Sequence, residues 1–91
     1  MSGSVEYLFA PSVTIADQAA RKQGWLPRGR ADWLKPDGTE VRFILLIEQL
    51  AAVGAGQMVH VIGKPKEPLR ILKRLGAAVV LHDAPRLKTG A

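Results

Sequence analysis

The sequence predicts an α/β fold: a small, open and mainly parallel sheet of four strands with three helices, in a Rossmann-like or flavodoxin-like strand order of 2-1-3-4. Three observations lead to this prediction. Residues 58–62 form a short apolar run, which Gly63 ends and the helix-breaking Pro65 follows. An apolar segment, 41–53, precedes this run, and a second helix-to-strand unit, 68–81, follows it. Strands that alternate with helices are typically parallel and joined by right-handed crossovers.

Local patterns predict where each element begins and ends. Thr14, with Asp17 three residues later, resembles a capping box at the start of the first helix. Gly24 is a natural residue to end that helix. The turn residues Lys35-Pro36-Asp37-Gly38 bound the second strand. The expected strands are 6–10, 31–34, 58–62 and 77–81. The expected helices are 15–23, 41–53 and 68–75, with inward faces made of Ile15, Ala16, Ala19 and Ala20 in the first and of Leu69, Leu72 and Leu75 in the third.

The segment 41–53 has two interpretations. Phe43, Ile47 and Leu50 recur at helical spacing and leave only a narrow polar stripe, which predicts a largely buried helix with Ile47 and Leu50 in the core. The composition of 41–47 also suits a strand. The length of the whole apolar segment favours the helix.

Length and composition exclude several classes of protein. The chain has 91 residues, which predicts one domain over 1–83, and a flexible tail over 84–91, where no periodicity is visible. It has no cysteine, which excludes disulfides and thiolate metal sites and makes a reducing cytoplasm the expected location. The N-terminus does not resemble a signal peptide. The most apolar window, 43–63, contains Glu48 and His60, so we expect no membrane span.

No motif predicts a catalytic, metal or cofactor site. Gly63-Lys64 lacks both the earlier glycine and the hydroxyl residue of a phosphate-binding loop. Gly54-Ala55-Gly56 precedes a strand instead of following one, so it is not a dinucleotide fingerprint. His60 and His82 are expected on neighbouring strands with Asp83 beside them, but no nucleophile or third metal ligand accompanies them. His60 is therefore expected to be a hydrogen-bonded strand residue.

The basic residues are distributed unevenly along the chain. Residues 1–60 carry six basic and six acidic side chains, whereas residues 61–91 carry seven basic side chains against Glu67 and Asp83, so the formal charge of +5 belongs to the last third. Four cations fall on one face of the third predicted helix: Lys66, Arg70, Lys73 and Arg74. Such a stripe neutralises phosphates in nucleic-acid-binding proteins, but it is also typical of a solvated helix face.

The predicted strand order places an anion site at the point where the chain reverses direction. The loops meeting there carry Ser12, Thr14, Lys64 and Lys66, and the site is expected to continue onto Arg70, Lys73 and Arg74. Arg28, Arg30 and Trp33 form a further extension, because aromatic rings beside arginines stack on bases. The alternative is that the tryptophan rings cover the core of a small domain.

Two functions follow from these patterns. The first is a non-catalytic module that binds nucleic acid or another phosphate-bearing ligand through its basic C-terminal third. The second is a protein-interaction or assembly module, including a homodimer, with no role in nucleic-acid binding. A salt titration distinguishes them, because phosphate contacts weaken steeply as the salt concentration rises.

Overall fold

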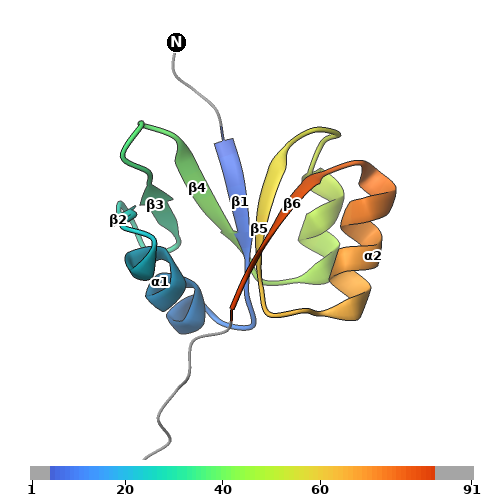
Figure 1. Ribbon diagram of the computed structural model, residues 1–91, viewed down its shortest axis with the longest axis horizontal. Coiled ribbons are helices and arrows are strands. Elements are labelled where there is room, and N and C mark those ends of the chain that lie inside the picture. Colours follow the sequence, from blue (N-terminus) through green and yellow to red (C-terminus); the bar gives the residue numbers. More distant parts are fainter. Residues whose placement is uncertain (1–4, 84–91) are drawn as a thin grey trace, which may run out of the picture.

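A six-stranded mixed sheet forms the centre of the molecule (Figure 1). The computed structural model describes residues 5–83, so the predicted tail over 84–91 lies outside the described residues. The strands are β1 (Val5–Phe9), β2 (Leu26–Pro27), β3 (Asp32–Leu34), β4 (Glu40–Ile44), β5 (Met58–Ile62) and β6 (Ala78–His82). The helices of this part of the chain are α1 (Val13–Lys22), the 3-10 helix η1 (Ile47–Ala52) and α2 (Lys66–Leu75).

The sheet topology corrects the predicted fold class. The strand order is β2-β3-β4-β1-β5-β6, in which β4, β1, β5 and β6 are parallel while β3 and β2 are antiparallel to their neighbours. The prediction of four mainly parallel strands in a Rossmann-like or flavodoxin-like order was therefore wrong. The segment 31–34 was expected beside β1, but β3 pairs with β4 and β2 instead.

The segment 41–53 is not one helix. Its first part is the strand β4, which lies between β1 and β3, and only its second part is helical, as the 3-10 helix η1. The turn that was predicted at Lys35 to Gly38 connects β3 to β4 as a hairpin, with Gly38 N–H donating to the Lys35 carbonyl (2.9 Å). A strand that returns from such a hairpin forms ladder hydrogen bonds at once, and the β-branched and aromatic residues of β4 suit that position. These non-local pairings outweigh the helical spacing of the apolar residues.

The helix α1 begins earlier than predicted. Ser12 is its N-cap, since the Ser12 hydroxyl accepts a hydrogen bond from the Ile15 amide (3.2 Å), and Thr14 lies inside the helix. The inward alanines are buried as expected. Gly24 adopts a φ of 86°, and Trp25 N–H donates to the Ala20 carbonyl (3.0 Å). This αL ending turns the chain back and brings Trp25 onto the sheet.

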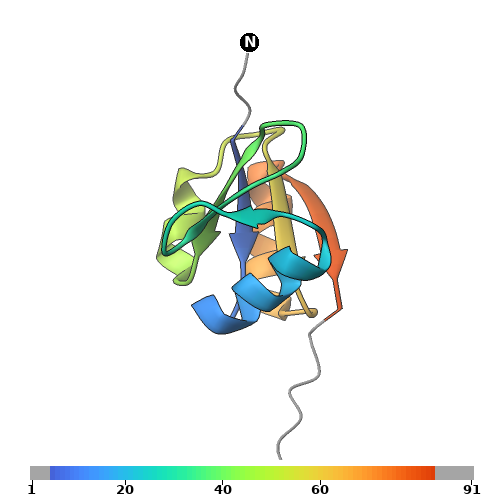
Figure 2. The same cartoon turned by 90° about the vertical axis from the view of Figure 1, so that its left-hand side faces the viewer.

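The helices cover both faces of the sheet. Figure 1 shows α1 on one side and η1 with α2 on the other, and Figure 2 shows α1 in front of the sheet. The core on the α1 side includes Leu8, Trp33 and Val41, whereas Leu50 and Leu72 belong to the core on the other side. Of the inward face predicted for the third helix, Leu72 is buried and Leu69 and Leu75 pack against the same core. That helix, α2, starts at Lys66 and ends at Gly76, which has a φ of 77°.

Candidate functional site

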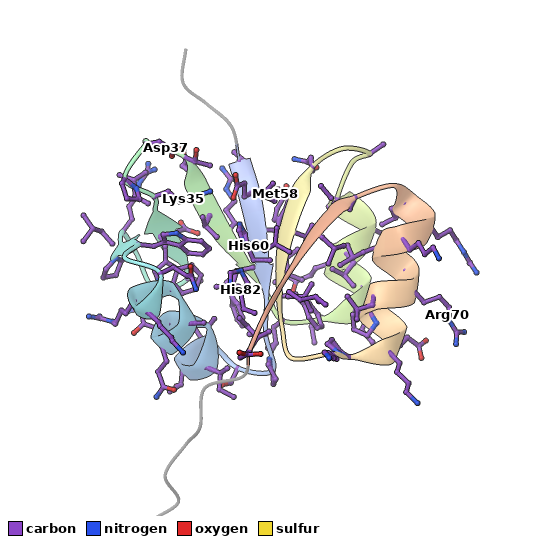
Figure 3. The ribbon with its side chains drawn as sticks, viewed as in Figure 1. Lys35, Asp37, Met58, His60, Arg70 and His82 are labelled. Atoms are coloured by element: carbon purple, nitrogen blue, oxygen red, sulfur yellow. The ribbon has the colours of Figure 1, made fainter. Side chains whose placement is uncertain are left out.

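Four polar side chains form a continuous hydrogen-bonded chain on the α1 side of the sheet. Lys35 Nζ lies 3.1 Å from Glu6 Oε1. The same Glu6 oxygen lies 2.7 Å from His60 Nε2, and His60 Nδ1 lies 2.8 Å from His82 Nε2. Figure 3 shows Lys35, His60 and His82 following one another along this side of the sheet. We call Lys35, Glu6, His60 and His82 the polar chain.

Strand register explains why these residues meet. Successive side chains of a strand point to opposite faces, so Glu6 shares a face with Leu8 on β1, and His60 shares one with Ile62 on β5. Leu8 pairs with His60 across β1 and β5, and Ile62 pairs with His82 across β5 and β6. The two histidines and the glutamate therefore project toward the same side of three adjacent strands. The hairpin before β4 brings Lys35 to Glu6 from the other direction.

Trp25 covers the polar chain. Its ring meets the His60 ring edge-on at a centroid distance of 4.7 Å and the His82 ring at 6.2 Å. Lys35 Nζ lies 5.8 Å from the centroid of the same indole ring, within the range of a cation–π contact. His60 is consequently only 4% exposed. Every described buried side-chain nitrogen and oxygen nevertheless has a hydrogen-bond partner, so the burial leaves no polar atom unsatisfied. Fully partnered buried networks of this kind are rigid.

The ionisation states follow from burial and partners. Burial raises the pKa of Glu6, but the hydrogen bonds from His60 and Lys35 outweigh it and hold that pKa below its ordinary value. Burial lowers the pKa of His60, and the hydrogen bond to Glu6 offsets this only in part. Burial also lowers the pKa of His82, and the neighbouring His60 lowers it further, while Asp83 opposes the shift. At neutral pH Glu6 is therefore a carboxylate and both imidazoles are neutral.

The tautomers of both histidines follow from these states. An ionised carboxylate only accepts hydrogen bonds, so His60 donates to Glu6 from Nε2. Neutral His60 then accepts at Nδ1, and His82 donates from Nε2. The remaining lone pair of His82 lies on Nδ1. Within the part of the chain that the structure describes, no hydrogen bond includes this atom.

Each end of the Glu6–His60–His82 segment lines a different hollow. Glu6 lines one of about 390 Å³ at the amino ends of β1 and β5, with Val5, Gly56, Gln57 and Met58. His82 lines one of about 310 Å³ between the end of α1 and the end of β6, with Ala19, Lys22, Gln23, Leu81 and Asp83. Both volumes fall at the lower end of the range of small-molecule pockets, about 300–1,000 Å³.

The polar chain predicts a pH dependence of folding stability. Both histidine pKa values are lower in the folded protein, so the unfolded chain takes up protons first as the pH falls below about 6.5. The free energy of unfolding therefore has its full value above this pH. Below it, the free energy of unfolding falls by at most about 1.4 kcal/mol per pH unit for each imidazole. Urea titrations at pH 8.0, 6.0 and 5.0 measure the decline. A His60→Gln/His82→Gln variant that declines equally over this range would contradict the assignment.

Four of the predicted basic residues lie on α2, and Lys64 lies two residues before its start. Lys64, Lys66, Arg70, Lys73 and Arg74 are all exposed, and Figure 3 shows Arg70 pointing away from the sheet. No ion pair of the described residues includes any of the five. We call these five residues the basic face of α2.

Two polar groups of the crevice that was predicted between Ser12 and Lys64 are engaged in the fold itself. The Ser12 hydroxyl caps α1, and the Gly63 amide donates to the His82 carbonyl (2.8 Å). Thr14 is exposed on α1. Neither of the two hollows described above is lined by Ser12, Thr14 or Lys64.

The predicted extension does not adjoin the basic face. Arg28 and Arg30 follow β2 and precede β3, whereas α2 leads into β6, so they belong to opposite edges of the sheet. Arg28 also pairs with Glu40 (3.3 Å). Trp33 is 1% exposed and donates its indole N–H to Asp17 (3.0 Å), so its ring belongs to the core and is not a stacking surface.

The sequence prediction placed the two histidines on neighbouring strands, and this is confirmed, as is the hydrogen bonding of His60. It missed their partner: the carboxylate is Glu6, which lies 54 residues away in sequence from His60, instead of Asp83. One available indication was a charged residue at an inward position of a strand, since Glu6 alternates in phase with Leu8 and Ala10. Nothing in the sequence indicated that Lys35 joins them.

Exposed apolar side chains form a further surface feature. Leu45, Leu46 and Ile47 follow β4 and are between 42% and 55% exposed.

Over residues 5–83, no helix combines the length and the apolar character needed to cross a membrane, and no cluster of three or more His, Cys, Asp or Glu residues could hold a metal ion. Comparisons with protein-family models, curated proteins and solved structures each returned no match to this chain.

Proposed function

We propose that this protein binds nucleic acid through the sugar-phosphate backbone, using the basic face of α2, without catalysing a reaction on it. The observation that supports the proposal most strongly is the contrast in charge pairing. Four of the six basic side chains in residues 1–60 form ion pairs with carboxylates: Arg21, Arg28, Lys35 and Arg42. The five cations of the basic face pair with no described carboxylate, so their charge is available to a polyanion.

The spacing of the cations suits a phosphate backbone. Lys66 and Arg74 are eight residues apart on α2, which corresponds to about 12 Å along a helix axis. Phosphates of one duplex strand recur about every 3.4 Å along the axis, so this length spans three or four of them. With five cations engaged, the logarithm of the binding constant should fall with the logarithm of the salt concentration at a slope of about −4 to −5.

The packing of α2 favours a polyanion in solution over a lipid surface. Helices that bind membranes insert an apolar face between the lipid headgroups. The apolar face of α2 packs on the sheet through Leu69, Leu72 and Leu75, so it is not available for insertion. The exposed face offers charge alone.

A pair of matched variants tests the proposal. Arg70→Gln/Arg74→Gln removes two charges from the basic face, and Arg28→Gln/Arg30→Gln removes two charges at the opposite edge of the sheet. Fluorescence anisotropy with labelled single-stranded and duplex oligonucleotides of several sequences, measured between low and physiological salt, gives the slope. The first variant is expected to weaken binding to all sequences alike and to reduce the slope by about 2. The second is expected to leave the slope unchanged.

The contrary outcomes are distinct. Equal losses in the two variants would show an effect of net charge alone. Binding that does not respond to salt, or no binding at low salt, would overturn the proposal. Either of these two results would favour the second function, a protein interface. The exposed apolar residues available for such an interface are Leu45, Leu46 and Ile47.

A further inference from the structure

The arrangement of Glu6, His60 and His82 matches that of an activated nucleophile. In enzymes that form covalent intermediates, the nucleophile lies within about 2.6–3.2 Å of a base, and a third group orients that base. Here His82 lies 2.8 Å from His60, and His60 lies 2.7 Å from Glu6. The third group is itself held by Lys35, and Trp25 covers the base. The free Nδ1 of His82 is the one lone pair of the two imidazoles that the network does not use.

We propose that His82 is a nucleophilic catalyst of acyl transfer, that it takes uncharged activated esters in the hollow between α1 and β6, and that His60 and Glu6 are its positioning residues. This activity is separate from nucleic-acid binding, because it uses the opposite side of the sheet from α2 (Figure 3). It does not depend on that function.

The reaction proceeds in two steps. His82 Nδ1 attacks the ester carbonyl carbon, a C–N bond forms, and the C–O bond to the alcohol breaks, so that the alkoxide leaves. The proton on His82 Nε2 passes to His60 Nδ1, and the Glu6 carboxylate balances the resulting charge. Water then attacks the acyl carbon and the C–N bond breaks. The proton returns from His60 to His82, while the carboxylate product and the two protons of the water are released.

The residues of the hollow define the class of substrate. Lys22 and Gln23 line it beside His82 and are hydrogen-bond donors of the kind that stabilise a developing oxyanion. Asp83 also lines it, and its negative charge balances that of Lys22. An uncharged ester is therefore favoured over a phosphorylated donor. Ala19 and Leu81 supply an apolar wall for the acyl group or the leaving group.

The hydrolysis of p-nitrophenyl acetate tests this proposal, with the full chain as the catalyst. The wild-type protein is expected to release nitrophenolate over many turnovers, at least about 100-fold faster per molecule than N-acetylhistidine at the same pH. His82→Gln should remove this excess, and His60→Gln should reduce it about 10-fold or more. Arg42→Gln, at an exposed side chain outside the hollow, is the matched control and should keep the wild-type rate. Circular dichroism establishes that each variant is folded.

Two measurements on the wild-type protein keep the test decisive if a variant does not fold. The rate should rise with pH at a midpoint below about 6.5, because burial lowers the pKa of His82. Mass spectrometry of acid-quenched samples should locate the acetyl group on His82. A single turnover with a stable acetyl group on Lys22, a wild-type rate in folded His82→Gln, or a rate no higher than that of N-acetylhistidine would each overturn the proposal.

Discussion

Replacing Leu50 with alanine is expected to lower the free energy of unfolding by about 2–5 kcal/mol, enough to unfold much of a domain this small. Leu50 is completely buried in η1, where it belongs to the core on the α2 side of the sheet together with Phe9, Val59 and Leu72. Alanine removes most of the side chain and leaves a cavity that neighbours on β1 and β5 fill only in part. Urea denaturation followed by circular dichroism measures the loss.

Ile47→Ala is the matched control, because the two residues lie three positions apart in the same short helix. Ile47 is 42% exposed, so its replacement is expected to change the free energy of unfolding by about 0.5 kcal/mol or less. The sequence predicted both residues in the core, and for Ile47 this was wrong. Residues three positions apart lie on the same face of a 3-10 helix, so the difference in exposure comes from position along the helix: Ile47 is the first residue of η1, and Leu50 lies one turn further in. Equal losses in the two variants would contradict this account.

Replacing Glu6 with leucine is expected to cost about 1–3 kcal/mol. The change leaves the buried N–H of His60 without an acceptor, and an unsatisfied buried donor keeps its full cost of desolvation. The Lys35 side chain is 21% exposed, so its ammonium group turns toward water and adds little to the loss. Denaturant titration at pH 7 gives the magnitude.

Glu6→Gln separates the hydrogen bond from the charge. Glutamine has almost the shape of glutamate, and its amide oxygen still accepts from His60, so the expected loss is smaller than that for leucine. Folding lowers the pKa of the Glu6 carboxyl group, so protonation of Glu6 below about pH 4.5 reduces the free energy of unfolding of the wild-type protein. The Glu6→Gln variant should lack this part of the decline. If leucine is tolerated as well as glutamine, the polar chain does not contribute to stability.

Several local features could be predicted from the sequence because neighbouring residues determine them. The glycines at 24 and 76 end α1 and α2, since both adopt the positive φ that side chains disfavour. The turn at Lys35 to Gly38, the strand 58–62 and the inward leucines of α2 are also confirmed. The adjacency of the two histidines was also predicted, whereas the anion site at the cations from Lys64 to Arg74 stays a prediction.

Only the tertiary structure decided the position of β4 and the composition of the polar chain. The residues of β4 suit a helix or a strand. The pairing of β4 with β1 and β3 outweighed the helical spacing of its apolar residues, and no local sequence pattern indicates that pairing. Glu6 and His60, which are 54 residues apart in sequence, meet because β1 and β5 pair in one register. Lys35 joins them because a hairpin returns to the same face. By itself, the sequence determined the periodicities, the ends of helices and the uneven distribution of charge. Which side chains became neighbours depended on strand order and register, because these are set by the packing of the whole chain.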